Sequence, residues 1–272
     1  MKTSVKDDRY ITSVILGISF IFWIILLADP GGIMGIEHCH MTTGGSSKVS
    51  LPMLLQMNSF SDMMLGWILM VLAMMLPKLI TPVQYIYAKS LKRRRLGLSL
   101  FFVISYTVVW SVMGIVMNMM ILGFSLLLPN SFLPALGIGI TALIWQFSPV
   151  KQRCLNRGHD HIPIAAFGWR SDLDVLKFGM MHGLWCIGSG WALMLFPMVL
   201  PEGHNLAMII VTVIMISEHM EHPRLPKWNF DFRVKLVRII VNRIKIILHR
   251  NEEAQYRISY KSFTGLLPKT EK

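Results

Sequence analysis

The stretch ITSVILGISFIFWIILLA, residues 11–28, decides the fold, because it is an unbroken run of apolar or small residues that stops at Asp29 and Pro30. A membrane helix needs roughly 20 such residues to cross the hydrocarbon core. The run is longer than the apolar part of a signal peptide, and no small-residue cleavage site follows it, so we expect a retained helix. Five further apolar runs lie at residues 63–80 (continuing to 87), 97–124, 134–149, 175–200 and 205–220. The sequence therefore predicts an all-α fold, a polytopic membrane helix bundle of about six transmembrane helices.

The composition agrees with a surface that faces lipid. Of the 272 residues, 53% are hydrophobic and 15% are charged, whereas a soluble domain carries about a quarter charged residues. Lysine and arginine number 27 against 15 acidic residues, which gives a net charge of +12. On so apolar a chain this excess indicates attraction to anionic lipid, and no motif predicts a nucleic-acid partner. Three cysteines are too few and too scattered for a disulfide framework.

The basic residues are distributed unevenly between the predicted loops. Those at 89–95, at 151–170 and in the tail would share one side, and the loops of the other side carry a single basic residue, Lys48. Cytoplasmic loops hold the excess of Lys and Arg in membrane proteins. We therefore predict a multi-pass protein of the inner (plasma) membrane with both termini cytoplasmic.

The chain divides into a six-helix transmembrane domain, residues 1–222, and a basic cytoplasmic tail, residues 223–272. Within 231–250, Val237, Val241, Ile244 and Leu248 share one helical face, and Lys235, Arg238, Asn242, Lys245 and His249 share the opposite one. Such a basic amphipathic helix is expected to lie on the anionic headgroups of the membrane surface. A helix that binds a partner protein is the alternative.

Residues 37–41 place soft and borderline metal ligands in an outer loop, as Glu37, His38, Cys39, His40 and Met41. Imidazole and thiolate suit copper and zinc, and the thioether favours Cu(I), so copper is preferred to zinc. The alternative is a polar loop that happens to contain two histidines.

A second group of donors is predicted within the membrane. His182 and Cys186 are four residues apart and share a helical face, and ionisable side chains at this depth are commonly functional. The second helix offers thioethers at Met63, Met64, Met70, Met74 and Met75. A cavity lined by methionine, histidine and cysteine would suit Cu(I). Alternatively, His182 bonds a backbone carbonyl and Cys186 packs as a small apolar residue.

Two further clusters lie nearer the inner side. Glu218, His219, Glu221 and His222 end the sixth helix, where the i, i+3 and i, i+4 spacings place two carboxylates and an imidazole on one face. The alternative is that a helix leaving the membrane needs polar residues there. Cys154, His159 and His161 form the other cluster, but its basic surroundings oppose cation binding.

Three segments in order resemble a bacterial and archaeal family described as predicted metal-binding integral membrane proteins. They read Trp67-x-x-Met70-x-x-Ala73-Met74-Met75-Leu76-Pro77, then Leu143-Ile144-Trp145-Gln146-Phe147-Ser148-Pro149-Val150-Lys151, then Gly179-x-x-His182-Gly183-Leu184-x-Cys186-x-Gly188-x-x-Trp191-Ala192-Leu193-Met194. The resemblance covers roughly residues 10–222. The family's usual Cys-x-Gly-Cys-Cys-Trp is degenerate here, since only Cys186 of the three cysteines is kept. Glu218 matches the family's acidic residue, and the resemblance implies metal binding.

No catalytic constellation or phosphate-binding loop is present, so the sequence leans towards a non-enzymatic role. The leading hypothesis is a membrane protein that binds, delivers or transports a metal, with copper as the expected ion. A non-catalytic subunit of a larger membrane complex is the second hypothesis, because small residues such as Gly179 and Gly183 permit close helix packing. A membrane component of a copper-dependent oxidase or oxygenase is the third.

Overall fold

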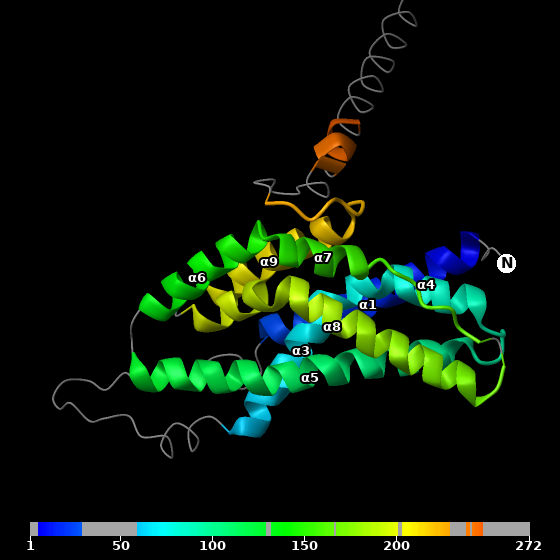
Figure 1. Ribbon diagram of the computed structural model, residues 1–272, viewed down its shortest axis with the longest axis horizontal. Coiled ribbons are helices and arrows are strands. Elements are labelled where there is room, and N and C mark those ends of the chain that lie inside the picture. Colours follow the sequence, from blue (N-terminus) through cyan, green and yellow to red (C-terminus); the bar gives the residue numbers. More distant parts are fainter. Residues whose placement is uncertain are drawn as a thin grey trace, which may run out of the picture.

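The computed structural model describes residues 5–28, 59–128, 132–165, 167–200, 203–228, 238–239 and 241–246. All regular secondary structure in these ranges is helical. The elements are α1 (Val5–Ala28), α3 (Phe60–Met75), the 3-10 helix η1 (Leu76–Leu79), α4 (Ile80–Lys89), α5 (Arg95–Leu127), α6 (Leu133–Gln146), α7 (Pro149–Arg157), α8 (Trp169–Val199) and α9 (His204–His219). The expected all-α fold is confirmed for this part of the chain (Figure 1).

Four helical segments in the described ranges are long and apolar enough to cross a membrane, at residues 7–28, 60–89, 95–124 and 169–199. The pair α6 and α7 would make a fifth if it is one bent span, and α9 is a shorter apolar helix. The prediction of about six spans is therefore not confirmed by length and composition. Beyond residue 228 the structure describes 238–239 and 241–246 as helical, which leaves the predicted amphipathic tail helix a prediction.

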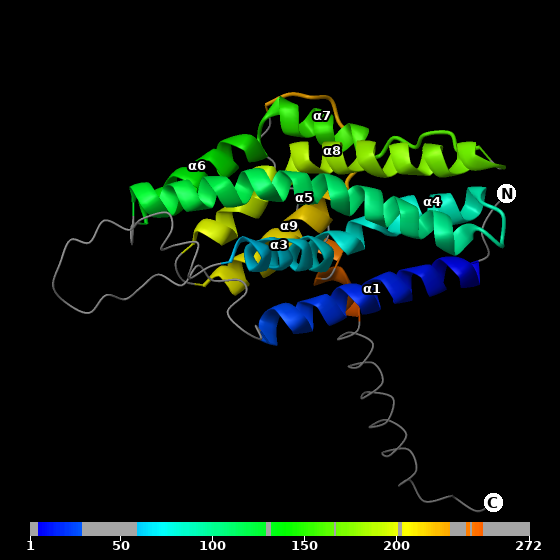
Figure 2. The same cartoon turned by 90° about the horizontal axis from the view of Figure 1, so that it is seen from below.

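Helices α5 and α8 pack along each other (Figure 1), and α1 lies on the opposite side of the bundle from α6 and α7 (Figure 2). Gly179 and Gly183 permit this approach. A Cβ added to Gly179 would lie 2.7 Å from the Phe102 carbonyl oxygen and against the Ser105 hydroxyl, and one on Gly183 would lie 3.1 Å from Val109. Small residues four apart allow the backbones of neighbouring membrane helices to meet in this way.

The second apolar run is one interrupted helix rather than a regular one. Pro77 lies at the start of η1, where its missing N–H and its ring disrupt the α-helical ladder and favour a tighter 3-10 turn. The turn places Lys78 in the bundle interior, where its side chain is 4% exposed. The Ser19 hydroxyl, from α1, donates to the Ala73 carbonyl oxygen just before this turn and fixes the outer helix against it.

The fourth run bends by 67° between α6 and α7. Ser148 precedes α7, its side-chain oxygen accepts from the Lys151 amide at 3.1 Å, and Pro149 occupies the first turn, which are typical signals of a helix start. The bend turns Lys151 inward, where it is fully buried. The sequence placed Lys151 at the start of a basic loop. The loop assignment was wrong for this residue, because residues 149–157 form a helix packed on α8.

The start of α1, the α4–α5 turn and the start of α8 meet at one end of the bundle. Arg94 bonds both carboxylate oxygens of Asp172 at 2.7 Å, and Arg95 lies 3.9 Å from Asp7. The opposite end holds the contact between Met63 at the start of α3 and Leu122 near the end of α5. Arg94 and Arg95, at the α4–α5 turn, therefore lie at the same end of the bundle as the start of α1.

Candidate metal site at the centre of the bundle

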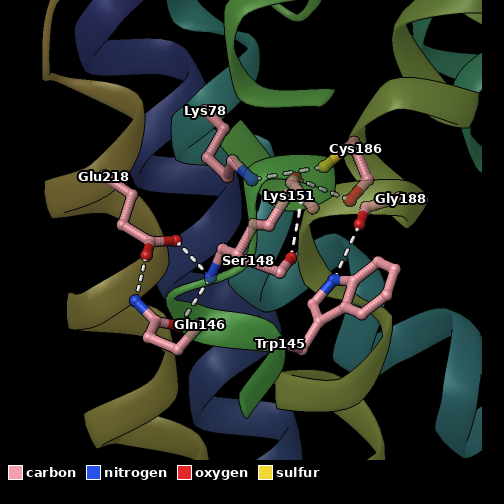
Figure 3. Close-up of polar contacts among 9 residues, drawn as sticks. Lys78, Trp145, Gln146, Ser148, Lys151, Cys186, Gly188 and Glu218 are labelled. Atoms are coloured by element: carbon pink, nitrogen blue, oxygen red, sulfur yellow. Dashed lines mark hydrogen bonds and ion pairs between the residues drawn. The ribbon is translucent and has the colours of Figure 1, made fainter. Parts of the chain in front are cut away.

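Cys186 lies near the middle of α8 and is 5% exposed. Three side chains face its sulfur. The Lys78 ammonium donates to it at 3.2 Å, the Tyr106 hydroxyl donates at 3.1 Å, and the Met75 sulfur lies 4.0 Å away. Figure 3 shows the Lys78 side chain reaching across to Cys186. The cysteine is therefore more than a small apolar residue, because two polar groups from two other helical segments converge on it.

His182, one helical turn before Cys186, lies among aromatic rings. Its ring centroid is 5.9 Å from those of Phe102 and Tyr106 and 6.1 Å from that of Phe178. Tyr106 thus touches both members of the predicted pair, through its ring on one side and its hydroxyl on the other. The structure brings His182 and Cys186 to one buried region, as their spacing predicts.

The methionines of α3 lie in different surroundings. Met70 and Met74 are fully buried in the hydrophobic core, and the thioether that faces Cys186 belongs to their neighbour Met75. Met64 instead accepts a hydrogen bond from the Asn118 amide at 3.5 Å. One of the five thioethers that the sequence offered is therefore placed beside the thiol.

Glu218 belongs to a separate buried polar cluster with Lys151 and Gln146, which joins α9 to the α6–α7 bend. The Lys151 ammonium lies 2.9 Å from the Glu218 carboxylate and 2.6 Å from the Gln146 side-chain oxygen. The Gln146 amide group also donates to Glu218, which closes a triangle (Figure 3). A buried carboxylate with an ammonium partner is a compensated charge. Glu218 thus has a packing role in this structure.

The residues after Glu218 do not share one helical face with it, because α9 ends at His219. Glu221 pairs instead with Arg224 at 2.8 Å, and His222 is exposed. His219 is stacked on His159 with ring centroids 5.0 Å apart and lies edge-on to His182 at 6.2 Å. The end of α9 therefore brings an imidazole towards the Cys186 region.

The fourth predicted cluster, that of Cys154, His159 and His161, is dispersed. Cys154 packs against α8 at Gly188, His161 lies against the Tyr85 ring, and the two ring nitrogens of His159 face the carbonyl oxygens of Leu155 and His219. The first predicted cluster, His38, Cys39, His40 and Met41, lies outside the described residues. In the part of the chain that is described, no group of three or more His, Cys, Asp and Glu side chains could hold a metal ion.

The sequence reasoning missed the roles of Lys78 and Tyr106. A lysine directly after Pro77 inside an apolar run is a signal that could have been used, because ionisable residues within membrane-spanning segments are rare and mark functional sites by default. Tyr106 carries no such signal, since a tyrosine in a membrane helix is commonly a packing residue. The contact with Cys186 depends on how α5 and α8 meet.

Comparison with known proteins identifies a family. A family model described as PpoB2, copper chaperone, matches residues 64–228, a segment that contains Met75, Lys78, Tyr106 and Cys186. No curated protein and no solved structure matches the chain.

Proposed function

Because this match covers more than half of the chain, the chain belongs to the PpoB2 copper chaperone family, and on that premise we propose that it is an integral membrane protein that binds Cu(I) as cargo. The copper-related family agrees with the metal that the ligand types favour. Cys186 and Met75 would hold the ion in the centre of the bundle, and His182 would be the third donor nearby. The protein would bind the ion and pass it on without acting as an enzyme.

The observation that carries this proposal is the 4.0 Å separation of the Cys186 and Met75 sulfurs. Thiolate and thioether are soft donors, which select Cu(I) over hard cations. Metal–thiolate bonds are roughly 2.3 Å long, as in zinc sites, so one ion bound to both sulfurs needs little movement of either. The donors present therefore fit a soft ion. They are not the set of carboxylates and imidazoles that suits zinc.

The membrane part of the proposal rests on the four long apolar helices and on the charge distribution. The Arg94–Asp172 pair, the Arg95–Asp7 pair and the starts of α1 and α8 lie at one end, and we place this end in the cytoplasm by the excess of basic residues. In this arrangement α6 with α7, and α9, are the fifth and sixth spans. The basic tail then also lies on the cytoplasmic side, against anionic headgroups.

Copper stoichiometry of the purified protein tests the proposal. Full-length protein in detergent is incubated anaerobically with Cu(I) held by a chromophoric chelator, desalted and analysed for bound copper. We expect Cys186→Ser to lose one ion per chain relative to the wild type and Met75→Leu to weaken binding about tenfold or more. Cys154→Ser is the matched control, because this second buried thiol faces Gly188 instead of a thioether, and it should bind copper normally.

Unchanged copper binding by Cys186→Ser would refute the site, and absence of stoichiometric Cu(I) from the wild type would refute the function.

An accessory subunit of a larger membrane complex is the second candidate function. An apolar cavity of about 750 Å³ lies between α6, α8 and α9, lined by residues such as Leu136, Ile140, Phe196 and Ile210. A partner helix could pack there. A stable partner that co-purifies after mild solubilisation would support this function, and a monodisperse copper-binding monomer would count against it.

A further inference from the structure

The copper site contains a positive charge where a metal site usually contains negative ones. The Lys78 ammonium donates to the Cys186 sulfur at 3.2 Å, and its side chain is 4% exposed. Lys78 comes from η1 and directly follows Pro77, so the turn that interrupts the second span also presents this ammonium to α8. From this position we infer that Lys78 makes the site selective for a monovalent soft cation over a divalent one of equal softness, an inference that rests on the proposed function.

The charge balance gives the physical reason. The form of cysteine that binds a metal is the thiolate, which with the Lys78 ammonium sums to zero. A monovalent ion then leaves the buried site with one net positive charge, and a divalent ion leaves it with two. The cost of burying charge rises steeply with its magnitude, and the ammonium repels a divalent ion twice as strongly as a monovalent one at the same distance.

The surrounding groups do not offset this effect. Glu218, a buried carboxylate of the bundle interior, contacts the Lys151 ammonium at 2.9 Å and the Gln146 amide, so its charge is compensated where it lies. His182 and Tyr106 lie beside Cys186 and Lys78, and His219 lies near Lys78 and against His182; none of these three side chains is a carboxylate. The described donors near the sulfur thus supply one negative charge, that of the thiolate itself.

Softness alone does not produce the same preference. Thiolate and thioether also bind soft divalent ions such as Cd(II) well, so a sulfur pair without the lysine would accept both charges. Lys78 is therefore a specificity-determining residue that acts through its charge, while Cys186 and Met75 supply the bonds.

The test compares Ag(I) with Cd(II), two soft ions that differ in charge, on full-length protein in detergent. Each ion is titrated separately, and bound metal is measured by elemental analysis after desalting. We expect the wild type to bind Ag(I) at the Cys186 site about tenfold or more tighter than Cd(II). Lys78→Met should raise the affinity for Cd(II) relative to Ag(I) by about tenfold or more, and Lys78→Gln should do the same with a polar side chain. Lys78→Arg keeps the charge and should keep the wild-type ratio.

Lys177→Met is the matched control, because it removes an exposed lysine from α8 and should leave the ratio unchanged. Each binding signal is assigned to the site as the part lost in Cys186→Ser. A wild type that binds Cd(II) at this site as tightly as Ag(I) would overturn the inference without any lysine variant. An unchanged ratio in Lys78→Met or Lys78→Gln would overturn it as well. A wild type that binds neither Cu(I) nor Ag(I) would instead refute the proposed function itself.

Discussion

Removal of the Lys151 ammonium should destabilise the bundle strongly. The Lys151 and Glu218 side chains are 0% and 2% exposed and their charged atoms are 2.9 Å apart. At an effective dielectric constant of about 20, the attraction between two unit charges at this distance is about 6 kcal/mol. Desolvation of both ions offsets much of it, but a variant that removes one partner keeps the cost of burying the other. Breaking a buried pair typically costs about 3–5 kcal/mol, which we expect for Lys151→Met.

The double variant separates this effect from simple loss of packing. In Lys151→Met with Glu218→Gln no charge remains at either position, and the amide oxygen introduced in place of the carboxylate can still accept from the Gln146 amide, as Glu218 does. We therefore expect the double variant to be clearly more stable than Lys151→Met alone, since replacing a whole buried pair is often close to neutral. The excess over additivity measures the coupling of the two side chains.

Reversible unfolding in mixed micelles, with increasing mole fraction of a denaturing detergent and helix content as the signal, gives the free energies. Arg224→Met is the control. Its guanidinium pairs with Glu221 at 2.8 Å but its side chain is 45% exposed, and pairs of this kind contribute about 0–1 kcal/mol. A loss below about 1 kcal/mol in Lys151→Met, or a double variant as unstable as the sum of the single ones, would refute a buried charge pair at the α6–α7 bend.

Gly179→Ala should lower stability by roughly 1–3 kcal/mol, because its Cβ would lie 2.7 Å from a carbonyl oxygen of α5. The control Gly137→Ala, whose Cβ meets nothing within 4 Å, should be neutral or stabilising in the same unfolding assay, and equal losses would contradict the packing described. Trp67→Phe removes a 2.9 Å hydrogen bond from the indole to an α5 carbonyl oxygen and should cost about 1 kcal/mol or more; an unchanged midpoint would argue against that contact. Arg94→Ala should cost less than about 1 kcal/mol despite its bidentate bond to Asp172, because the two side chains are 38% and 35% exposed. A larger loss would show that this end of the bundle is shielded from water.

The hydropathy of the chain was sufficient to predict the helical class and the positions of the long helices. The run at 97–124 corresponds to α5, and the run at 175–200 is contained within α8 apart from Leu200. Within a membrane a long apolar segment forms a helix, because every backbone polar group must be satisfied within the segment. The ends were less predictable. α8 begins earlier, at Trp169, where polar residues continue the helix beyond the apolar run.

The number of spans was harder to predict from the sequence, because of a local feature of the fourth run. The fourth run ends at a serine and a proline that start a new helix and bend the chain, and the segment after it has the composition of a loop. Composition alone cannot distinguish a basic loop from a helix that buries its lysine against a carboxylate of α9. That partner is Glu218, which lies far along the chain from Lys151.

The sequence by itself determined which donors are available to a metal and that His182 and Cys186 share a face, because the spacing of residues within one helix is fixed by its geometry. Only the tertiary structure decided which thioether of the second span faces the thiol. Met75, the last residue of α3 before the 3-10 turn η1, is the one that lies beside Cys186. The same turn, together with the close contact of α5 and α8, places Lys78 and Tyr106 on the sulfur. These contacts join residues that are 80 and 108 positions apart, and no local pattern encodes such a meeting.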